Sequence, residues 1–187
     1  MKYCWILAAA LLLLAGCAAG VDKAPAAAGN GEITAVTLTS PVFGPGETIP
    51  ARFSCKGEDL SPALEWQTPP AGTQSLALIM DDPDAPVGNW VHWVIYNIPP
   101  GESGLAEGAS RSNGQPNLPE GTAQGSNSWK RGAYGGPCPP SGEHRYFFRL
   151  YALDIVIPAE GLDKAALLKE MDGHVLAQGE LMGKFGK

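Results

Sequence analysis

Basic residues are scarce in this sequence. Only 13 of its 187 residues are Lys or Arg, against 19 Asp or Glu, and the formal net charge at pH 7 is −6. The sequence also has no basic stripe with interleaved aromatic residues. Proteins that bind nucleic acid neutralise its phosphates with clustered cations. The composition therefore argues against a nucleic-acid partner.

Long hydrophobic runs are missing as well. The longest weakly apolar run, residues 3–15, follows Lys2. It is too short to cross a bilayer, because a spanning helix needs about 20 apolar residues. A short apolar run behind a positive charge is typical of a signal peptide.

This run ends in Leu14-Ala-Gly-Cys17, which resembles the lipobox of bacterial lipoproteins. In those proteins the chain is cut before the Cys, whose acyl chains then anchor it to a membrane. We expect residues 1–16 to be a lipoprotein signal peptide and Cys17 to be lipidated. The alternative is an ordinary secretory signal cleaved near Ala18 or Ala19. Because Ala18 is not the Asp that resembles an inner-membrane retention signal, the expected location is the outer membrane or surface of a bacterial envelope.

The segment after the proposed cleavage site is rich in Ala and Gly. Residues 17–31 are therefore expected to form a flexible tether with a lipid anchor at its start. Residues 32–187 are enough for one domain with a hydrophobic core and leave little room for a second.

Cysteine is also rare, with four residues in the chain. If Cys4 leaves with the signal peptide and Cys17 is lipidated, Cys55 and Cys138 remain in an exported domain. Two cysteines in an oxidising compartment favour one disulfide. A pair of buried free thiols stays open, because a sequence does not show the distance between Cβ atoms.

Most of the domain consists of short β-rich runs bounded by Gly or Pro. The runs that predict strands are residues 33–39, 64–67, 75–81, 91–98, 146–154 and, more weakly, 175–184. One segment, 162–171, is typical of a helix, with Asp163 as N-cap and Gly173 as its stop. The pattern predicts an all-β antiparallel sandwich with one or two short peripheral helices.

Two rigid turns lie beside strands that contain histidines. Asp81–Pro86 reads Asp-Asp-Pro-Asp-Ala-Pro and precedes His92, and a Gly/Pro-rich loop precedes His144 and Tyr146. Because side chains alternate along a strand, His144 and Tyr146 should share one face, and His92 should share another with Val94 and Tyr96.

The glycines of the second turn, Gly135 and Gly136, are expected to offer free backbone amides. Imidazoles, a phenol and such amides are hydrogen-bond donors that suit phosphate-like oxygens. Arg145 and Arg149 should point away from this face and pair with surface acids. The tryptophans Trp66, Trp90, Trp93 and Trp129 are expected to be packing residues.

The two turns resemble the signature regions of the phosphatidylethanolamine-binding protein (PEBP) family, in particular its bacterial Raf-kinase-inhibitor-like branch. The matching motifs are Asp82-Pro-Asp-Ala-Pro86, Trp90-Val-His92-Trp and Gly136-Pro-Cys-Pro-Pro-x-Gly-x-His144-Arg-Tyr146. The match runs in order through nearly the whole mature domain.

This resemblance implies a Greek-key type β-sandwich with a shallow anion pocket, which in relatives takes phosphate or a phospholipid head group. By position, the implied ligand-binding residues are Asp82, Pro86, His92, Gly136, His144 and Tyr146. The lipid anchor is not a general family feature, which weakens any transfer of kinase-regulatory roles.

We therefore expect a membrane-anchored, non-catalytic protein that binds a small anionic group, with neither a cofactor nor a metal. One alternative is an inhibitor or regulator of a protease or hydrolase that acts through protein contact. Another is a metal-dependent hydrolase built on His92, His144 and Asp82. The metal-dependent alternative is disfavoured because no HxH or HxxxH spacing preorganises the ligands. A nucleophilic enzyme is disfavoured because the sequence has no Gly-x-Ser-x-Gly motif.

Overall fold

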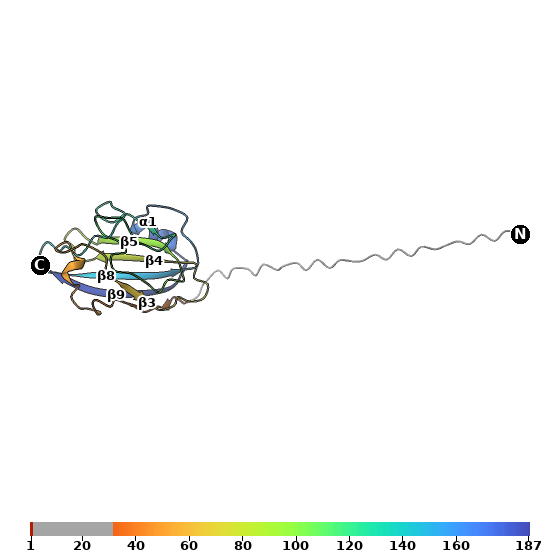
Figure 1. The fold of residues 1–187 in the computed structure, drawn as a ribbon, viewed down its shortest axis with the longest axis horizontal. Coiled ribbons are helices and arrows are strands. Elements are labelled where there is room, and N and C mark those ends of the chain that lie inside the picture. Colours follow the sequence, from red (N-terminus) through yellow and green to blue (C-terminus); the bar gives the residue numbers. More distant parts are fainter. Residues whose placement is uncertain (2–31) are drawn as a thin grey trace.

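The computed structural model describes Met1 and residues 32–187 (Figure 1). The predicted signal peptide, the lipidation of Cys17 and the tether of residues 17–31 fall on residues outside the described part, and they stay predictions. Within the described part, no helix has both the length and the apolar character needed to cross a membrane.

Two β-sheets make up the domain, which confirms the all-β expectation. The larger sheet has the order β1-β9-β8-β4-β5-β7 and the smaller one β2-β3-β6. The larger sheet consists of β1 (Thr34–Ala35), β9 (Val175–Gly186), β8 (Glu143–Leu153), β4 (Ser75–Asp82), β5 (Trp90–Ile98) and β7 (Ala123–Gln124). The smaller consists of β2 (Leu38–Thr39), β3 (Leu64–Trp66) and β6 (Gly104–Leu105).

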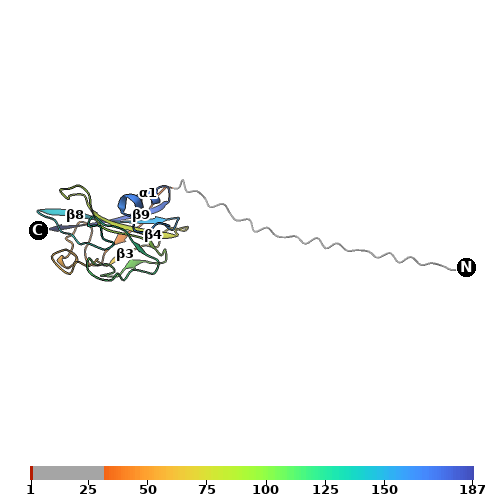
Figure 2. The same cartoon turned by 90° about the horizontal axis from the view of Figure 1, so that it is seen from above.

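The main hydrophobic core lies between the two sheets. Leu38 and Trp66 of the small sheet pack in one cluster with Met80, Ile95 and Phe148 of the large sheet. Seen from above, β3 lies on one side of the large sheet and α1 (Lys164–Met171) on the other (Figure 2).

Helix α1 covers the outer face of the large sheet. Its buried residues Leu167 and Met171 join a second cluster with Ile79, Val94 and Tyr96. Asp163 caps the helix as predicted, because its side chain accepts a hydrogen bond from the Ala166 amide at 3.0 Å. A single turn of 3-10 helix, η1 (Ala51–Phe53), precedes the first cysteine of the domain.

The predicted strand at residues 33–39 is in fact two short strands in different sheets. Thr34–Ala35 runs parallel to β9, whereas Leu38–Thr39 pairs with β3. The chain crosses from one sheet to the other between them, and a period-2 pattern does not reveal which sheet a residue joins. The short edge strands β6 and β7 come from the long segment 99–143 and were not predicted.

Candidate functional site

A cavity of about 300 Å³ opens at one end of the large sheet, where β4 ends and β5 and β8 begin. Its lining residues are Asp82, Ala85, Pro86, Val87, Trp90, His92, Cys138, Pro140 and His144. Four of the predicted site residues, Asp82, Pro86, His92 and His144, are thus brought together. The volume is at the lower end of the range for small-ligand pockets.

A β-bulge in β5 aims His92 toward this cavity. Met80 pairs with Trp93 but Asp81 pairs with Val91, so β5 has one extra residue at position 92. A bulge of this kind re-aims a side chain and is common beside functional sites. The ring of His92 contacts that of Tyr146 edge-on at 5.2 Å between centroids.

The prediction that His92 shares a face with Val94 and Tyr96 was therefore wrong. Val94 and Tyr96 belong to the cluster beneath α1, on the outer face of the sheet. The prediction for β8 was right, because Tyr146 packs with Phe148 in the main core and His144 lines the cavity on the same face. Strict alternation failed in β5 only because of the bulge.

Hydrogen bonds fix the orientation of His92. Its Nδ1 lies 2.6 Å from the carbonyl oxygen of Gly135, and the Gly135 amide donates back to the carbonyl of His92 at 3.0 Å. Burial lowers the pKa of His92, and the Gly135 carbonyl and the charge of Asp82 offset part of this effect. Burial thus disfavours the charged form of this ring, and the hydrogen bond at Nδ1 fixes its orientation.

His144 is held by a carboxylate instead. Its Nδ1 lies 2.7 Å from Oδ2 of Asp82, and both side chains are largely buried. The other carboxylate oxygen, Oδ1, accepts the Asp84 amide at 2.8 Å. Asp82 therefore orients His144 and at the same time fixes the turn that leads to Pro86.

A second ion pair clamps the same turn onto β8. Asp84 accepts hydrogen bonds from Nε and from an Nη of Arg145 at 2.9 and 2.7 Å, and from the Arg145 backbone amide. The Arg145 guanidinium lowers the pKa of Asp84 to about 2. As predicted, Arg145 pairs with an acid outside the pocket, and Arg149 pairs with Glu180 and also with the buried Asp81.

The expected free amides of the glycine turn are not free. The Gly135 amide is bonded to His92, and the Gly136 amide donates to Oδ1 of Asp59 at 2.6 Å. A Cβ atom at Gly136 would lie 2.3 Å from the Phe53 carbonyl oxygen, so this position requires glycine for close packing. Gly136 supports the wall of the site and does not present its amide to a ligand.

Tyr146 lies beside the cavity without lining it. It is fully buried, and its hydroxyl has no hydrogen-bond partner in the described residues. Burial and the nearby charge of Asp82 raise its pKa. A buried hydroxyl without a partner is costly and uncommon.

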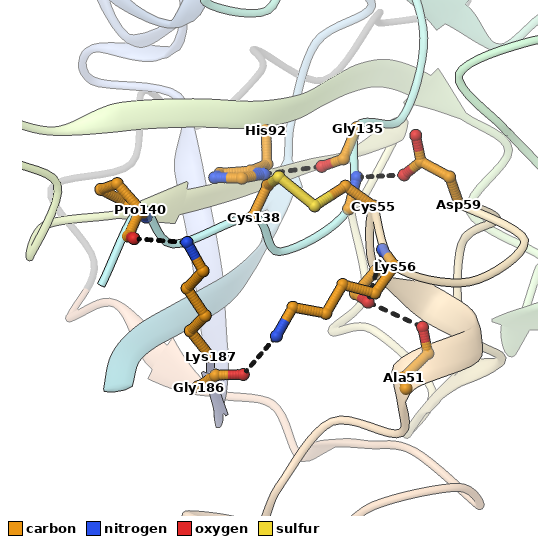
Figure 3. The surroundings of a disulfide bond; sticks show 12 residues. Ala51, Cys55, Lys56, Asp59, His92, Gly135, Cys138, Pro140, Gly186 and Lys187 are labelled. Carbon is orange, nitrogen blue, oxygen red and sulfur yellow. Dashed lines mark hydrogen bonds between the residues drawn. A yellow bond between two sulfur atoms is a disulfide. The ribbon is translucent and has the colours of Figure 1, made fainter. Parts of the chain in front are cut away.

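The predicted disulfide is present and forms part of the cavity wall. Cys55 and Cys138 are bonded, with their Cα atoms 5.4 Å apart, and Cys138 lines the cavity. Figure 3 shows His92 and Gly135 beside this bond, with Pro140 further along the same loop. The cross-link joins segments 83 residues apart, which constrains the unfolded chain by about 4–5 kcal/mol in the chain-entropy estimate.

Sequence reasoning missed three aromatic and apolar contributions to the site. Trp90, expected to be a packing residue, lines the cavity, and Trp129 stacks edge-on against His92 at 5.0 Å. Val87 is 78% exposed at the rim. The position of Trp90 next to the Val-His92 motif was a usable signal, whereas nothing local linked Trp129 to His92.

No group of three or more His, Cys, Asp or Glu among residues 32–187 is arranged to hold a metal ion. The nitrogen Nδ1 of each pocket histidine is turned toward a protein acceptor. Buried polar groups around an apolar-rimmed cavity are typical of a small-ligand site.

Comparison with known proteins places this chain in a family. The family model for phosphatidylethanolamine-binding proteins matches residues 39–186. The chain belongs to the phosphatidylethanolamine-binding protein family. This agrees with the three motifs from which the resemblance was first drawn.

Relatives that match over nearly their whole length are found in archaea and bacteria. A UPF0098 protein of Methanothermobacter thermautotrophicus is 48% identical over 151 residues, covering 80% of this chain and 98% of that protein. A UPF0098 protein of Chlamydia muridarum is 44% identical, covering 79% of this chain and 97% of that protein.

Solved structures share the fold. A putative phosphatidylethanolamine-binding protein homologue from Chlamydia trachomatis matches with a TM-score of 0.74 and 42% identity, covering 82% of this chain and 99% of its own. YbcL of Escherichia coli, described as a member of the mammalian family, matches with a TM-score of 0.75 and 32% identity, covering 81% and 98%.

Proposed function

We propose that this protein binds small phosphate-type anions in the cavity between His92 and His144, without chemical turnover. The supporting observation is the convergence of two imidazole rings from different strands on one small cavity. Each ring is oriented by a hydrogen bond at Nδ1, which leaves Nε2 for a ligand. The name of the family, which refers to a phospholipid, supports the same ligand chemistry.

Two potential nucleophiles of the cavity, a carboxylate and a cysteine, are already engaged within the protein. A nucleophile needs a free side-chain group within reach of the reacting atom. Asp82 is already bonded to His144 and to the Asp84 amide, and Cys138 is in a disulfide. A rigid cavity whose acid side chain is occupied internally is suited to hold a ligand.

We further propose that the protein acts in the bacterial envelope, anchored through a lipid on Cys17. The disulfide supports an oxidising compartment, because such bonds persist outside the reducing cytoplasm. The lipobox-like Leu14-Ala-Gly-Cys17 supports the anchor. Labelling cells with an alkyne fatty acid tests this: Cys17→Ser should abolish labelling, and labelling that persists contradicts the proposal.

Nitrogen-detected NMR of the histidines tests the binding proposal. Phosphate should shift the Nε2 resonances of His92 and His144 in a saturable way. His174 is a matched internal control, since its Nδ1 is bonded to Asp154 at 2.8 Å but it lies outside the cavity. Resonance shifts in His174 alone, or in none of the three rings, would contradict the proposal.

A further inference from the structure

The hydrogen bonds at Nδ1 determine where the proton of each pocket histidine resides. The partner of His92 is a backbone carbonyl, and that of His144 is the carboxylate of Asp82. Neither partner has a hydrogen to donate when Asp82 is ionised. The hydrogen must therefore be on Nδ1 in both rings, and a neutral ring has a lone pair at Nε2.

Both rings line the cavity, and their Nε2 atoms form no hydrogen bond within the described residues. Among the described residues, the fully buried polar side-chain atoms without a hydrogen-bond partner are Thr122 Oγ1 and the Tyr146 hydroxyl. The Nε2 atoms of His92 and His144 also form no hydrogen bond, but they are not among these fully buried atoms. Since both rings line the same cavity, its space is where a ligand oxygen meets these atoms.

An oxygen of a fully ionised anion has lone pairs but no hydrogen to donate. The same is true of Nε2 in a neutral imidazole whose proton is on Nδ1. A close contact between them requires one proton, which comes either from the ligand or from a second protonation of the ring. The second route is disfavoured for His92, because burial lowers its pKa.

The surrounding charges also favour a ligand that brings its own proton. The titratable or charged groups that face the two rings are Asp59, Asp82, Asp84, Arg145 and Tyr146. The one cation among them, Arg145, is already paired with Asp84. A doubly charged anion would therefore meet uncompensated carboxylate charge, whereas a singly charged one meets less repulsion.

We propose that the cavity selects phosphate groups that can carry an exchangeable proton, namely inorganic phosphate and phosphate monoesters, over phosphodiesters. The proton is shared between a ligand oxygen and Nε2 of His92 or His144. This inference rests on the proposed anion-binding function and specifies its ligand class. A phosphate monoester has its second pKa near 6, so it supplies this proton around neutral pH, and a diester does not.

The distinction separates two sources of the same chemistry. The phosphate of an intact phospholipid such as phosphatidylethanolamine is a diester, whereas free phosphorylethanolamine is a monoester with the same amine. The inference favours the released, soluble compound over the lipid in a membrane.

Calorimetry at pH 6 provides the test, with phosphorylethanolamine compared against glycerophosphorylethanolamine. Near this pH the diester and the protonated monoester each have a singly charged phosphate, so overall charge is nearly matched. The monoester should bind at least about tenfold more tightly, the effect of one unmade hydrogen bond to a buried group. At pH 7.5, runs in two buffers of different ionisation enthalpy should show about one proton taken up per monoester bound.

The outcomes separate this inference from the proposed function. Equal affinity for the two compounds without proton uptake overturns the inference but leaves anion binding intact. Tighter binding of phosphatidylethanolamine vesicles than of the monoester also overturns it. If no phosphate compound binds at any pH, the proposed function itself fails.

Glutamine variants locate the shared proton. The Gln side chain in His92→Gln or His144→Gln offers a permanent N–H donor near the position of Nε2. At least one of these variants should lose the preference for the monoester together with the proton uptake, and His174→Gln should keep both. If both pocket variants keep the wild-type ratio and proton count, the inference is wrong. The calorimetry of the wild-type protein decides the question even if a variant does not fold.

Discussion

Two consecutive carboxylates, Asp81 and Asp82, lie on opposite faces of β4 and have contrasting surroundings. Asp81 is fully buried beneath α1, where it pairs with Arg149 and Lys164 and accepts a hydrogen bond from Asn89. Asp82 is nearly as buried, but its side-chain partner is the imidazole of His144, beside the cavity. Asp81 thus has two permanently charged cations as partners, whereas Asp82 has a histidine ring.

This difference distinguishes a structural acid from a functional one. A buried carboxylate with permanent cations links elements together, as Asp81 links α1 and β8 to the end of β4. A carboxylate whose side-chain partner is an imidazole instead orients that ring beside the cavity, as Asp82 orients His144. The same residue type therefore serves stability on one face of the sheet and ligand binding on the other.

The largest effect is expected from Asp81→Ala. It leaves the partly buried Arg149 and Lys164 without their shared partner and should lower the free energy of unfolding by about 3 kcal/mol. Urea denaturation measures this loss. Phosphate affinity should stay within about twofold of the wild type, since Asp81 is on the far face of the sheet. A loss of affinity without loss of stability would contradict the comparison.

Asp82→Ala should have a smaller effect on stability than Asp81→Ala and a larger effect on phosphate affinity. Stability falls by about 1–2 kcal/mol, because the buried His144 ring and the Asp84 amide lose an acceptor. Phosphate affinity at pH 6 should fall about tenfold or more, since no carboxylate then holds the His144 ring in place beside the cavity. Calorimetric titration checks this, and unchanged or tighter binding contradicts the role given to Asp82.

The pH dependence of stability should expose the buried His92. Its pKa is lowered in the folded protein, so the unfolded chain binds more protons as the pH falls below about 6.5. Stability from this group is present above that pH and is lost as the pH falls, by at most about 1.4 kcal/mol per unit. Unfolding measured from pH 7 to 5 in phosphate-free buffer reports it.

The matched control for that experiment is His92→Asn. An Asn side chain still offers an N–H to the Gly135 carbonyl but has no group that titrates in this range. Its stability curve should be flatter than that of the wild type. Equal slopes for the two proteins would mean that His92 is not the source of the effect.

The smallest effect is expected from Asp84→Asn at the exposed pair with Arg145. Surface ion pairs contribute little because water screens them. The pKa of Asp84 is about 2 in the folded state against an ordinary value of 3.8. The lowered pKa means that its contribution is present above pH 4 and is lost as the pH falls toward 2. The variant and the wild type should therefore differ slightly in melting temperature at pH 5 and not at pH 2.

The sequence predicted the main strands, the helix with its Asp163 cap and the disulfide, because these depend on local patterns and on cysteine counting. Period-2 runs located β3, β4, β5 and β9 to within a few residues. The edge strands β6 and β7 were missed, since two-residue strands have too few positions to show a period. Their pairing depends on the neighbouring strands and not on their own residues.

The sequence indicated which residues lie around the cavity better than it indicated how they are arranged. The motifs named Asp82, Pro86, His92 and His144, and these four residues line one cavity. The bulge at His92 and the internal use of the Gly136 amide were not foreseen. Both depend on partners distant in sequence, the register against β4 and the carboxylate of Asp59, which no local pattern reveals.

A crystal structure of the protein grown with phosphate tests the central claim most directly. The account predicts a phosphate in the cavity, with its oxygens at about 2.7–3.2 Å from Nε2 of His92 and of His144. The Nδ1 bonds to Gly135 and Asp82 should be unchanged. A cavity that stays empty while phosphate binds elsewhere, or a phosphate held only by the rim, would contradict it.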